Sequence, residues 1–148
     1  MADFVSALGA ELESKNGKVS TAEALEGKRY VMLYFSAHWC PPCRGFTPVL
    51  ASKFKASAEE KQIAVVFVSS DRDEAAFDEY FAEMPWFALP FAARDAKSAL
   101  GEKYGVRGIP SLVVLDSTGK LVTKEGRGQV DTFFSDGAKA KKCGCVIS

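Results

Sequence analysis

Residues 39–44 read Trp39-Cys40-Pro41-Pro42-Cys43-Arg44, which places two cysteines three positions apart. The β-branched and aromatic residues over 30–35, directly upstream, predict a buried strand, and the apolar spacing over 46–54 predicts a helix. The dithiol is therefore expected where a strand passes into a helix. Free N–H groups and the helix dipole at such a junction favour a thiolate at the first cysteine.

This position assigns different roles to the two thiols. Cys40, at the start of the helix, is the expected nucleophile. Cys43 lies one helical turn further on and is expected to be partly covered, which suits attack on a mixed disulfide that Cys40 has formed. Pro41 and Pro42 fix φ and supply no N–H, which a first helical turn tolerates, so the loop should be stiff before a substrate arrives.

Two other uses of a Cys-x-x-Cys pair fit this sequence less well. A structural zinc ion would need two more ligands, and the sequence offers only Cys143, Cys145 and the single His38. A permanent disulfide would close a very small loop and constrain little of the unfolded chain. We therefore expect a redox-active dithiol and no metal.

Length and composition predict one globular domain. The 148 residues are 47% hydrophobic, which is enough for a single core. Nineteen basic and nineteen acidic residues cancel, so no overall field attracts nucleic acid. Four cysteines do not make a disulfide scaffold, and the chain opens without a signal segment, so we expect a reducing, cytoplasmic location. No apolar run reaches the length of a membrane span.

Strand and helix patterns alternate along the chain. An amphipathic stretch over 4–12 and a turn signal at Asn16-Gly17 come first and suggest an N-terminal hairpin extension. Strands are predicted at 30–36, 63–69, 111–115 and 120–125, and helices at about 42–58, 73–83 and 95–104. This order predicts an α/β fold with a mixed central β-sheet flanked by helices. We expect one domain over 1–136 and a basic, mobile tail over 137–148.

Several motifs around the dithiol resemble the tryparedoxin and nucleoredoxin branch of the thioredoxin superfamily. They are the runs 34–44, 68–71, 84–91 and 104–110, together with Gly126-Arg127, and the similarity extends over about residues 28–130. Thioredoxins proper usually carry Gly-Pro between the cysteines and a buried Asp six residues before the first. This chain has Pro-Pro and Tyr34 at those places. The resemblance implies a thioredoxin fold.

The same resemblance implies further site residues. Pro110 should be a cis proline that faces the dithiol, with the backbone of Ile109 free to pair with an extended substrate segment; the alternative is a trans proline at a strand entry. Trp39 should shield the dithiol and offer an aromatic surface to partners; the alternative, a partly buried core residue, is compatible with that role.

Four polar or aromatic residues have two interpretations each. Asp71 could move protons through a water when the disulfide opens, or cap a helix. Tyr34 and Arg127 match site positions of the family, but could fill the core or pair with a surface carboxylate. His38 could stabilise a thiolate or face solvent at a strand end.

These residues predict a thiol–disulfide oxidoreductase that reduces protein disulfides, such as those of peroxiredoxins. The resemblance implies no bound cofactor and an external electron donor, which is trypanothione for tryparedoxins and glutathione or an NADPH-dependent reductase for nucleoredoxins. We expect the protein to be a monomer. The alternative is a membrane-tethered, redox-sensitive binding protein whose dithiol state gates partner binding.

The C-terminal residues Cys145-Val146-Ile147-Ser148 fit the CaaX pattern for farnesylation, and Cys143 is available for acylation. Because one lipid chain holds a membrane weakly, the lysines at 139, 141 and 142 or a second acyl group would supply the remaining affinity. The tail therefore predicts membrane association. It could instead carry incidental cysteines, or Cys143 and Cys145 could form an accessory redox pair, although C-x-C spacing strains a disulfide.

Overall fold

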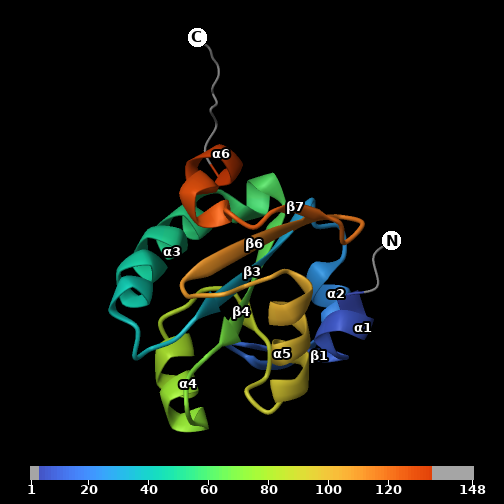
Figure 1. Cartoon of the computed structure of the whole chain (residues 1–148). Coiled ribbons are helices and arrows are strands. Elements are labelled where there is room, and N and C mark those ends of the chain that lie inside the picture. Colours follow the sequence, from blue (N-terminus) through green and yellow to red (C-terminus); the bar gives the residue numbers. More distant parts are fainter. Residues whose placement is uncertain (1–3, 135–148) are drawn as a thin grey trace.

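The computed structural model describes residues 4–134, which form one seven-stranded sheet with helices on both faces (Figure 1). In chain order the elements are α1 (Phe4–Leu8), β1 (Glu11–Ser14), β2 (Gly17–Ser20), α2 (Thr21–Leu25), β3 (Tyr30–Ser36), α3 (Pro41–Lys61), β4 (Ile63–Ser69), α4 (Glu74–Phe81), β5 (Phe87–Ala88), α5 (Arg94–Lys103), β6 (Ser111–Asp116), β7 (Leu121–Thr123), the 3₁₀-helix η1 (Gly126–Gln129) and α6 (Val130–Phe134). The strand order is β2-β1-β5-β4-β3-β6-β7. Since β3 is parallel to β4 and antiparallel to β6, the predicted mixed sheet is confirmed.

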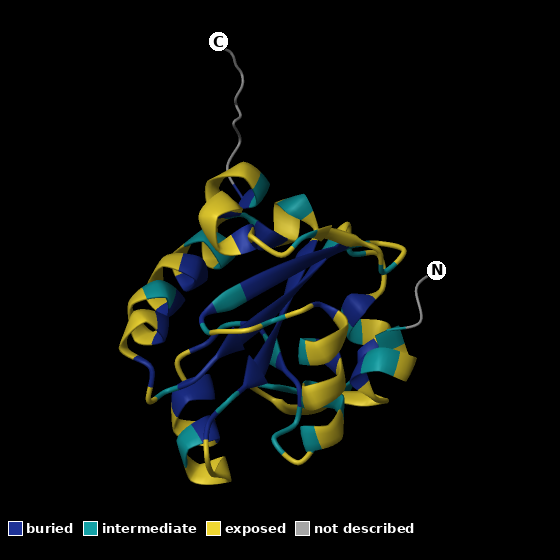
Figure 2. Cartoon of the chain, viewed as in Figure 1, coloured by how far each residue is buried: buried dark blue, intermediate teal, exposed yellow. Residues whose placement is uncertain are grey.

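The central strands β3 and β4 are almost completely buried, as Figure 2 shows. Helices cover both of their faces, and strands in that position consist of nearly continuous apolar residues. Successive side chains point to opposite faces of the sheet. Met32 and Tyr34 of β3 therefore pack in the core under α3, α4 and α6, whereas Leu33 and Phe35 pack in the core under α1, α2 and α5.

The N-terminal region contains the predicted hairpin, but its amphipathic stretch is not one element. Helix α1 ends at Leu8, and Gly9 has a φ of 89°, a left-handed conformation that glycine adopts without strain at a helix end. The chain then forms β1, and Lys15 and Asn16 form the turn that joins β1 to β2, which begins at Gly17. The hairpin belongs to the main sheet, because Glu13 of β1 pairs with Ala88 of β5.

The short elements α2, β5, η1 and α6 were not predicted. Each has five residues or fewer, too few to show a period in the sequence. Helix α6 lies where the sequence pattern weakens, yet it buries Val130 and Phe134 against the same core as Leu50 of α3. Within residues 4–134, no helix is long and apolar enough to cross a membrane.

Candidate active site

The dithiol lies at the junction between β3 and α3, as predicted. Cys40 is the N-cap of α3 in an extended conformation, and its Sγ accepts the N–H of Cys43 at 3.4 Å. Pro41 and Pro42 occupy the first helical positions, where a missing N–H removes no helical hydrogen bond. The first turn of α3 therefore fixes the two sulfurs on one side of the helix start.

The two thiols differ in their access to solvent. Both cysteines are free thiols, and the exposed fraction is 5% for Cys40 and 0% for Cys43. Burial raises the pKa of Cys43 to about 11, and its hydrogen bond with Cys40 adds to this increase, while a hydrogen bond with Ser36 opposes it. Cys43 is therefore a protonated thiol at neutral pH, and Cys40 is the sulfur that a substrate meets first.

Pro110 lies opposite the dithiol after a cis peptide bond from Ile109, which confirms the predicted isomer. The Sγ of Cys40 lies 3.9 Å from the carbonyl oxygen of Ile109. A groove of about 630 Å³ runs from Trp39 past Ile109 toward α5. A second groove, of about 460 Å³, is lined by the segment from Tyr104 to Val113 and by Arg127. The loop before Pro110 thus lines both hollows, and it is the Ile109 carbonyl of this loop that lies next to the Cys40 sulfur.

Trp39 is a surface residue with 51% of its area exposed, so its interpretation as a core residue was wrong. Its indole Nε1 donates to the carbonyl of Ser70 at 3.0 Å, and the Arg72 guanidinium lies 5.6 Å from the ring centre. These contacts hold the ring next to Cys40 with one side open to solvent. A partner that approaches Cys40 would meet this aromatic surface.

Asp71 is buried and holds the loop that leads to Cys40. Its Oδ1 accepts the backbone N–H of His38 at 2.7 Å, and its Oδ2 accepts the hydroxyl of Ser69 at 2.7 Å. Asp73, not Asp71, caps α4 by accepting the N–H of Ala76. The alternative that Asp71 caps a helix was therefore wrong, since the cap of α4 lies two residues further on. The role of Asp71 in proton transfer stays a prediction.

The His38 side chain lies against α4. Its ring centre lies 5.4 Å from that of Tyr80, and its Nδ1 lies 3.6 Å from Glu79 at the surface. Arg127 lies over the Phe46 ring, with 6.0 Å between the guanidinium carbon and the ring centre. It lines the second groove together with Pro110. Both residues thus flank the site, and neither is part of the cysteine pair.

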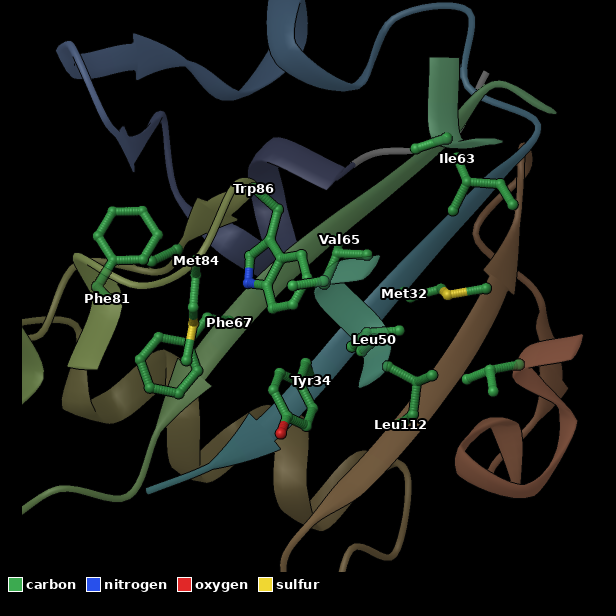
Figure 3. Close-up of a cluster of buried hydrophobic side chains, with 14 of the residues drawn as sticks. Met32, Tyr34, Leu50, Ile63, Val65, Phe67, Phe81, Met84, Trp86 and Leu112 are labelled. Carbon is green, nitrogen blue, oxygen red and sulfur yellow. The ribbon is translucent and has the colours of Figure 1, made fainter. Parts of the chain in front are cut away.

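Beneath the dithiol lies a buried group of four hydroxyl side chains, here called the hydroxyl cluster: Tyr34, Ser36, Thr47 and Tyr80. The Tyr34 ring packs among Phe67, Leu50 and Trp86, with its oxygen pointing away from Trp86 (Figure 3). That oxygen lies 2.6 Å from Thr47 Oγ1 and 3.3 Å from the carbonyl of Cys43. Burial holds the pKa of Tyr34 well above its ordinary value, so it is a neutral hydroxyl.

Of the hydroxyl cluster, only Tyr34 was predicted to belong to the site. Ser36 is the last residue of β3, Thr47 lies on α3 and Tyr80 on α4, and a lone Ser, Thr or Tyr in an apolar segment gives no signal in the sequence. The period of β3 alone would have placed Ser36 on the same face as Tyr34. Within residues 4–134, no three side chains of His, Cys, Asp and Glu group together as a metal site would need. Cys143 and Cys145 lie outside the described residues.

A strand–dithiol–helix junction opposite a cis proline, in a mixed sheet with helices on both faces, defines a redox protein of the thioredoxin type. The sequence profile of the thioredoxin-like family matches residues 27–121. The chain belongs to this family, and the resemblance seen in its motifs is confirmed.

Its relatives include proteins of both predicted branches. Nucleoredoxin from Danio rerio is 43% identical over 128 residues, which are 86% of this chain and 30% of that protein. Tryparedoxin from Trypanosoma brucei brucei is 47% identical over 120 residues, 80% of this chain and 82% of that protein. A solved structure of tryparedoxin II complexed with glutathionylspermidine has a TM-score of 0.80 at 36% identity, covering 90% of this chain and 91% of that chain. The tryparedoxin and nucleoredoxin homologues are thiol–disulfide oxidoreductases.

Proposed function

We propose that this protein reduces disulfides in other proteins through the Cys40–Cys43 dithiol. The observation that carries the proposal is the asymmetry of the two thiols: Cys40 caps the helix beside the Ile109 carbonyl, and Cys43 is completely buried with a raised pKa. This difference favours one order of attack, because Cys40 keeps a small exposed area at the surface, whereas Cys43 has none and its thiol stays protonated.

The reaction has two exchange steps. The Cys40 thiolate attacks one sulfur of the substrate disulfide, so a Cys40–substrate disulfide forms and the other substrate sulfur leaves as a thiolate. Cys43 then loses its proton to water and attacks the Cys40 sulfur. The Cys40–Cys43 disulfide forms, the second substrate sulfur leaves, and two electrons have passed to the substrate.

The substrate would approach over Trp39 and Ile109. Trp39 offers a large, fixed apolar ring at the rim of the groove beside Cys40, which suits contact with a protein surface. An extended segment next to the substrate disulfide could hydrogen-bond to the backbone at Ile109. We propose peroxiredoxins and other disulfide-containing proteins as the substrate class, with the protein acting as a cytoplasmic monomer.

The electron donor would be external, because the chemistry needs only a second dithiol exchange to regenerate the reduced pair. The related tryparedoxin II has been solved with glutathionylspermidine. We propose a donor of the small-thiol class, trypanothione or glutathione, with an NADPH-dependent reductase as the competing donor. The rate at which each donor reduces the isolated Cys40–Cys43 disulfide distinguishes them.

Insulin reduction tests the proposed function. The wild type should precipitate reduced insulin in the presence of dithiothreitol well above the uncatalysed rate, and Cys40→Ser should fall to that background. A variant with serine at both 143 and 145 is the matched control and should keep full activity, since the proposed chemistry uses neither tail cysteine. Activity that survives Cys40→Ser would rule out the mechanism.

The tail prediction concerns residues outside the described part of the chain and has its own test. We propose that farnesylation at Cys145, with Cys143 or the preceding lysines as a second signal, attaches the protein to membranes. The intact mass of the protein from its native cell measures this directly. A farnesylated, trimmed C-terminus supports the proposal, and an unmodified Ser148 end refutes it.

A further inference from the structure

At the end of β4, the backbone pairing with β5 stops before the Ser69 carbonyl. The last bond between the two segments runs from the Leu89 N–H to the Phe67 carbonyl at 2.9 Å. In a parallel ladder that continued, the N–H of Phe91 would donate to the Ser69 carbonyl two residues further on. The chain instead leaves the sheet at Pro90 and forms a turn. The Ser69 carbonyl therefore needs a donor from elsewhere.

The Arg94 side chain supplies this donor. Its Nη1 donates to the Ser69 carbonyl at 3.1 Å, and its Nε donates to the Phe91 carbonyl at 2.6 Å. The guanidinium carbon lies 4.1 Å from the centre of the Phe91 ring, which is a cation–π distance. Burial lowers the pKa of this guanidinium, and the negative charge of Asp71 opposes the decrease. Arg94 thus replaces one bond of the ladder and joins the end of β4 to α5, of which it is the first residue.

Residues 69–71, here called the β4 end segment, hold the two residues that precede the first cysteine. The Ser70 carbonyl accepts the indole N–H of Trp39 at 3.0 Å. The Asp71 carboxylate accepts the backbone N–H of His38 at 2.7 Å. Arg94 bonds to the first residue of this segment, so its contact reaches Trp39 through the neighbouring residue of the chain.

The groove of about 630 Å³ beside the dithiol is lined by both parts of the molecule that Arg94 joins. Trp39 and Ser70 belong to the part at the end of β4, and Lys97 and Gly101 belong to α5. Arg94 itself lines neither of the two grooves. Because its backbone begins α5 and its side chain bonds to the β4 end segment, it fixes how far apart these lining residues lie.

We propose that Arg94 is a positioning residue for substrate binding, which holds Trp39 and α5 at the separation that a segment of a protein substrate requires. This inference rests on the proposed function and concerns its first step. Arg94 donates to backbone carbonyls and to neither sulfur, so it takes no part in the exchange of disulfide bonds. It should act on the binding of a protein substrate and leave the attack by Cys43 unchanged.

The test compares a protein disulfide with a small one, using the full-length chain with serine at 143 and 145 and dithiothreitol as the reductant. Insulin is large enough to fill the groove, whereas bis(2-hydroxyethyl) disulfide is not. Arg94→Met removes both hydrogen bonds of the side chain. It should raise the KM for insulin about fivefold at nearly unchanged kcat, the pattern of lost binding. The rate with the small disulfide should stay within about twofold of wild type.

Two further variants test whether the effect passes through Trp39. Arg94→Lys keeps the charge but lacks the planar fork that reaches two carbonyls, so it should raise the KM for insulin about twofold. Trp39→Phe keeps an aromatic ring and removes the N–H that Ser70 accepts. In that background Arg94→Met should raise the KM by less than about twofold, because both changes release the same contact. A purely structural defect would add its full effect.

Arg29→Met is the matched control. The Arg29 guanidinium lies 5.4 Å from the centre of the Tyr30 ring, at the start of β3, whereas the dithiol follows the end of that strand. The control variant should keep the wild-type KM and kcat for insulin. If Arg94→Met does not fold, the KM of Arg94→Lys decides in its place.

Three results overturn the inference: an unchanged KM for insulin in the Arg94 variants, an equal loss of rate with the small disulfide, or the full effect of Arg94→Met in the Trp39→Phe background. A wild type that does not reduce insulin, or insulin reduction that survives Cys40→Ser, overturns the proposed function instead. The two failures are therefore distinguishable in one set of assays.

Discussion

Cys43 should resist alkylation in the folded, reduced protein far more than an ordinary cysteine. Burial raises its pKa to about 11. At pH 7 its thiolate fraction is then about 10⁻⁴, against about 3% for a free cysteine of pKa about 8.5. Ionisation alone predicts alkylation about 300-fold slower than that of a free cysteine. The absence of exposed area at Cys43 adds to this protection.

The assay is iodoacetamide labelling of Cys40→Ser, in which Cys43 is the remaining thiol of the site, followed by mass measurement of the peptide that contains Cys43. The labelling rate should rise about tenfold per pH unit between pH 7 and 10, because the fraction of Cys43 in the reactive thiolate form rises by that factor. The same variant in denaturant is the control and should react at the ordinary rate. Labelling of the folded protein within a few-fold of the denatured control at pH 7 would refute the account of Cys43.

Four further predictions concern stability. Gly126→Ala should lower the free energy of unfolding in urea by about 1–3 kcal/mol, because the added Cβ would lie 2.7 Å from Val114 Cγ2 and 2.8 Å from the Leu112 carbonyl and would overpack the core. An unchanged free energy of unfolding would mean that η1 can move to make room. Tyr34→Phe keeps the ring contacts but removes the hydrogen bond to Thr47, so it should lower the free energy of unfolding by about 1 kcal/mol. An unchanged free energy of unfolding would mean that the hydroxyl cluster does not stabilise the fold. Asp71→Ala should cost about 1–3 kcal/mol, since it leaves the His38 N–H and the Ser69 hydroxyl without an acceptor, and wild-type unfolding would contradict this. For Cys43, the unfolded state releases its thiol proton at a lower pH than the folded state, so the reduced protein should lose stability from about pH 9 to about 11. Cys43→Ala should not show this loss of stability with rising pH.

The main elements could be predicted because their patterns are long and their ends are marked. Strands β3 and β4 have seven residues each and begin and end where the sequence predicts. Helix α3 continues to Lys61, three residues past the predicted end, because Gln62 with a φ of 58° provides its left-handed C-cap and glutamine is not a usual signal for that conformation. The elements that were missed are held by tertiary contacts, as α6 is by Phe134 in the core.

The chemistry of the site was predictable where a motif specifies it, and not where it depends on the approach of distant segments. The cysteine pair follows from a short run of sequence, and the cis bond before Pro110 was implied by the family resemblance. The partnership of Ser36 with Tyr80 joins positions 44 residues apart. Only the folded sheet brings these two hydroxyls together, so no local pattern indicates it.

The central claim is that Cys40 attacks a substrate disulfide and Cys43 resolves the product. The most direct measurement is the intact mass of Cys43→Ser after reaction with a disulfide-bonded peroxiredoxin under non-reducing conditions. The account predicts a stable one-to-one complex joined through Cys40, which dithiothreitol releases and which the double variant Cys40→Ser, Cys43→Ser does not form. A covalent complex in that double variant, or joined through any other cysteine, would contradict it.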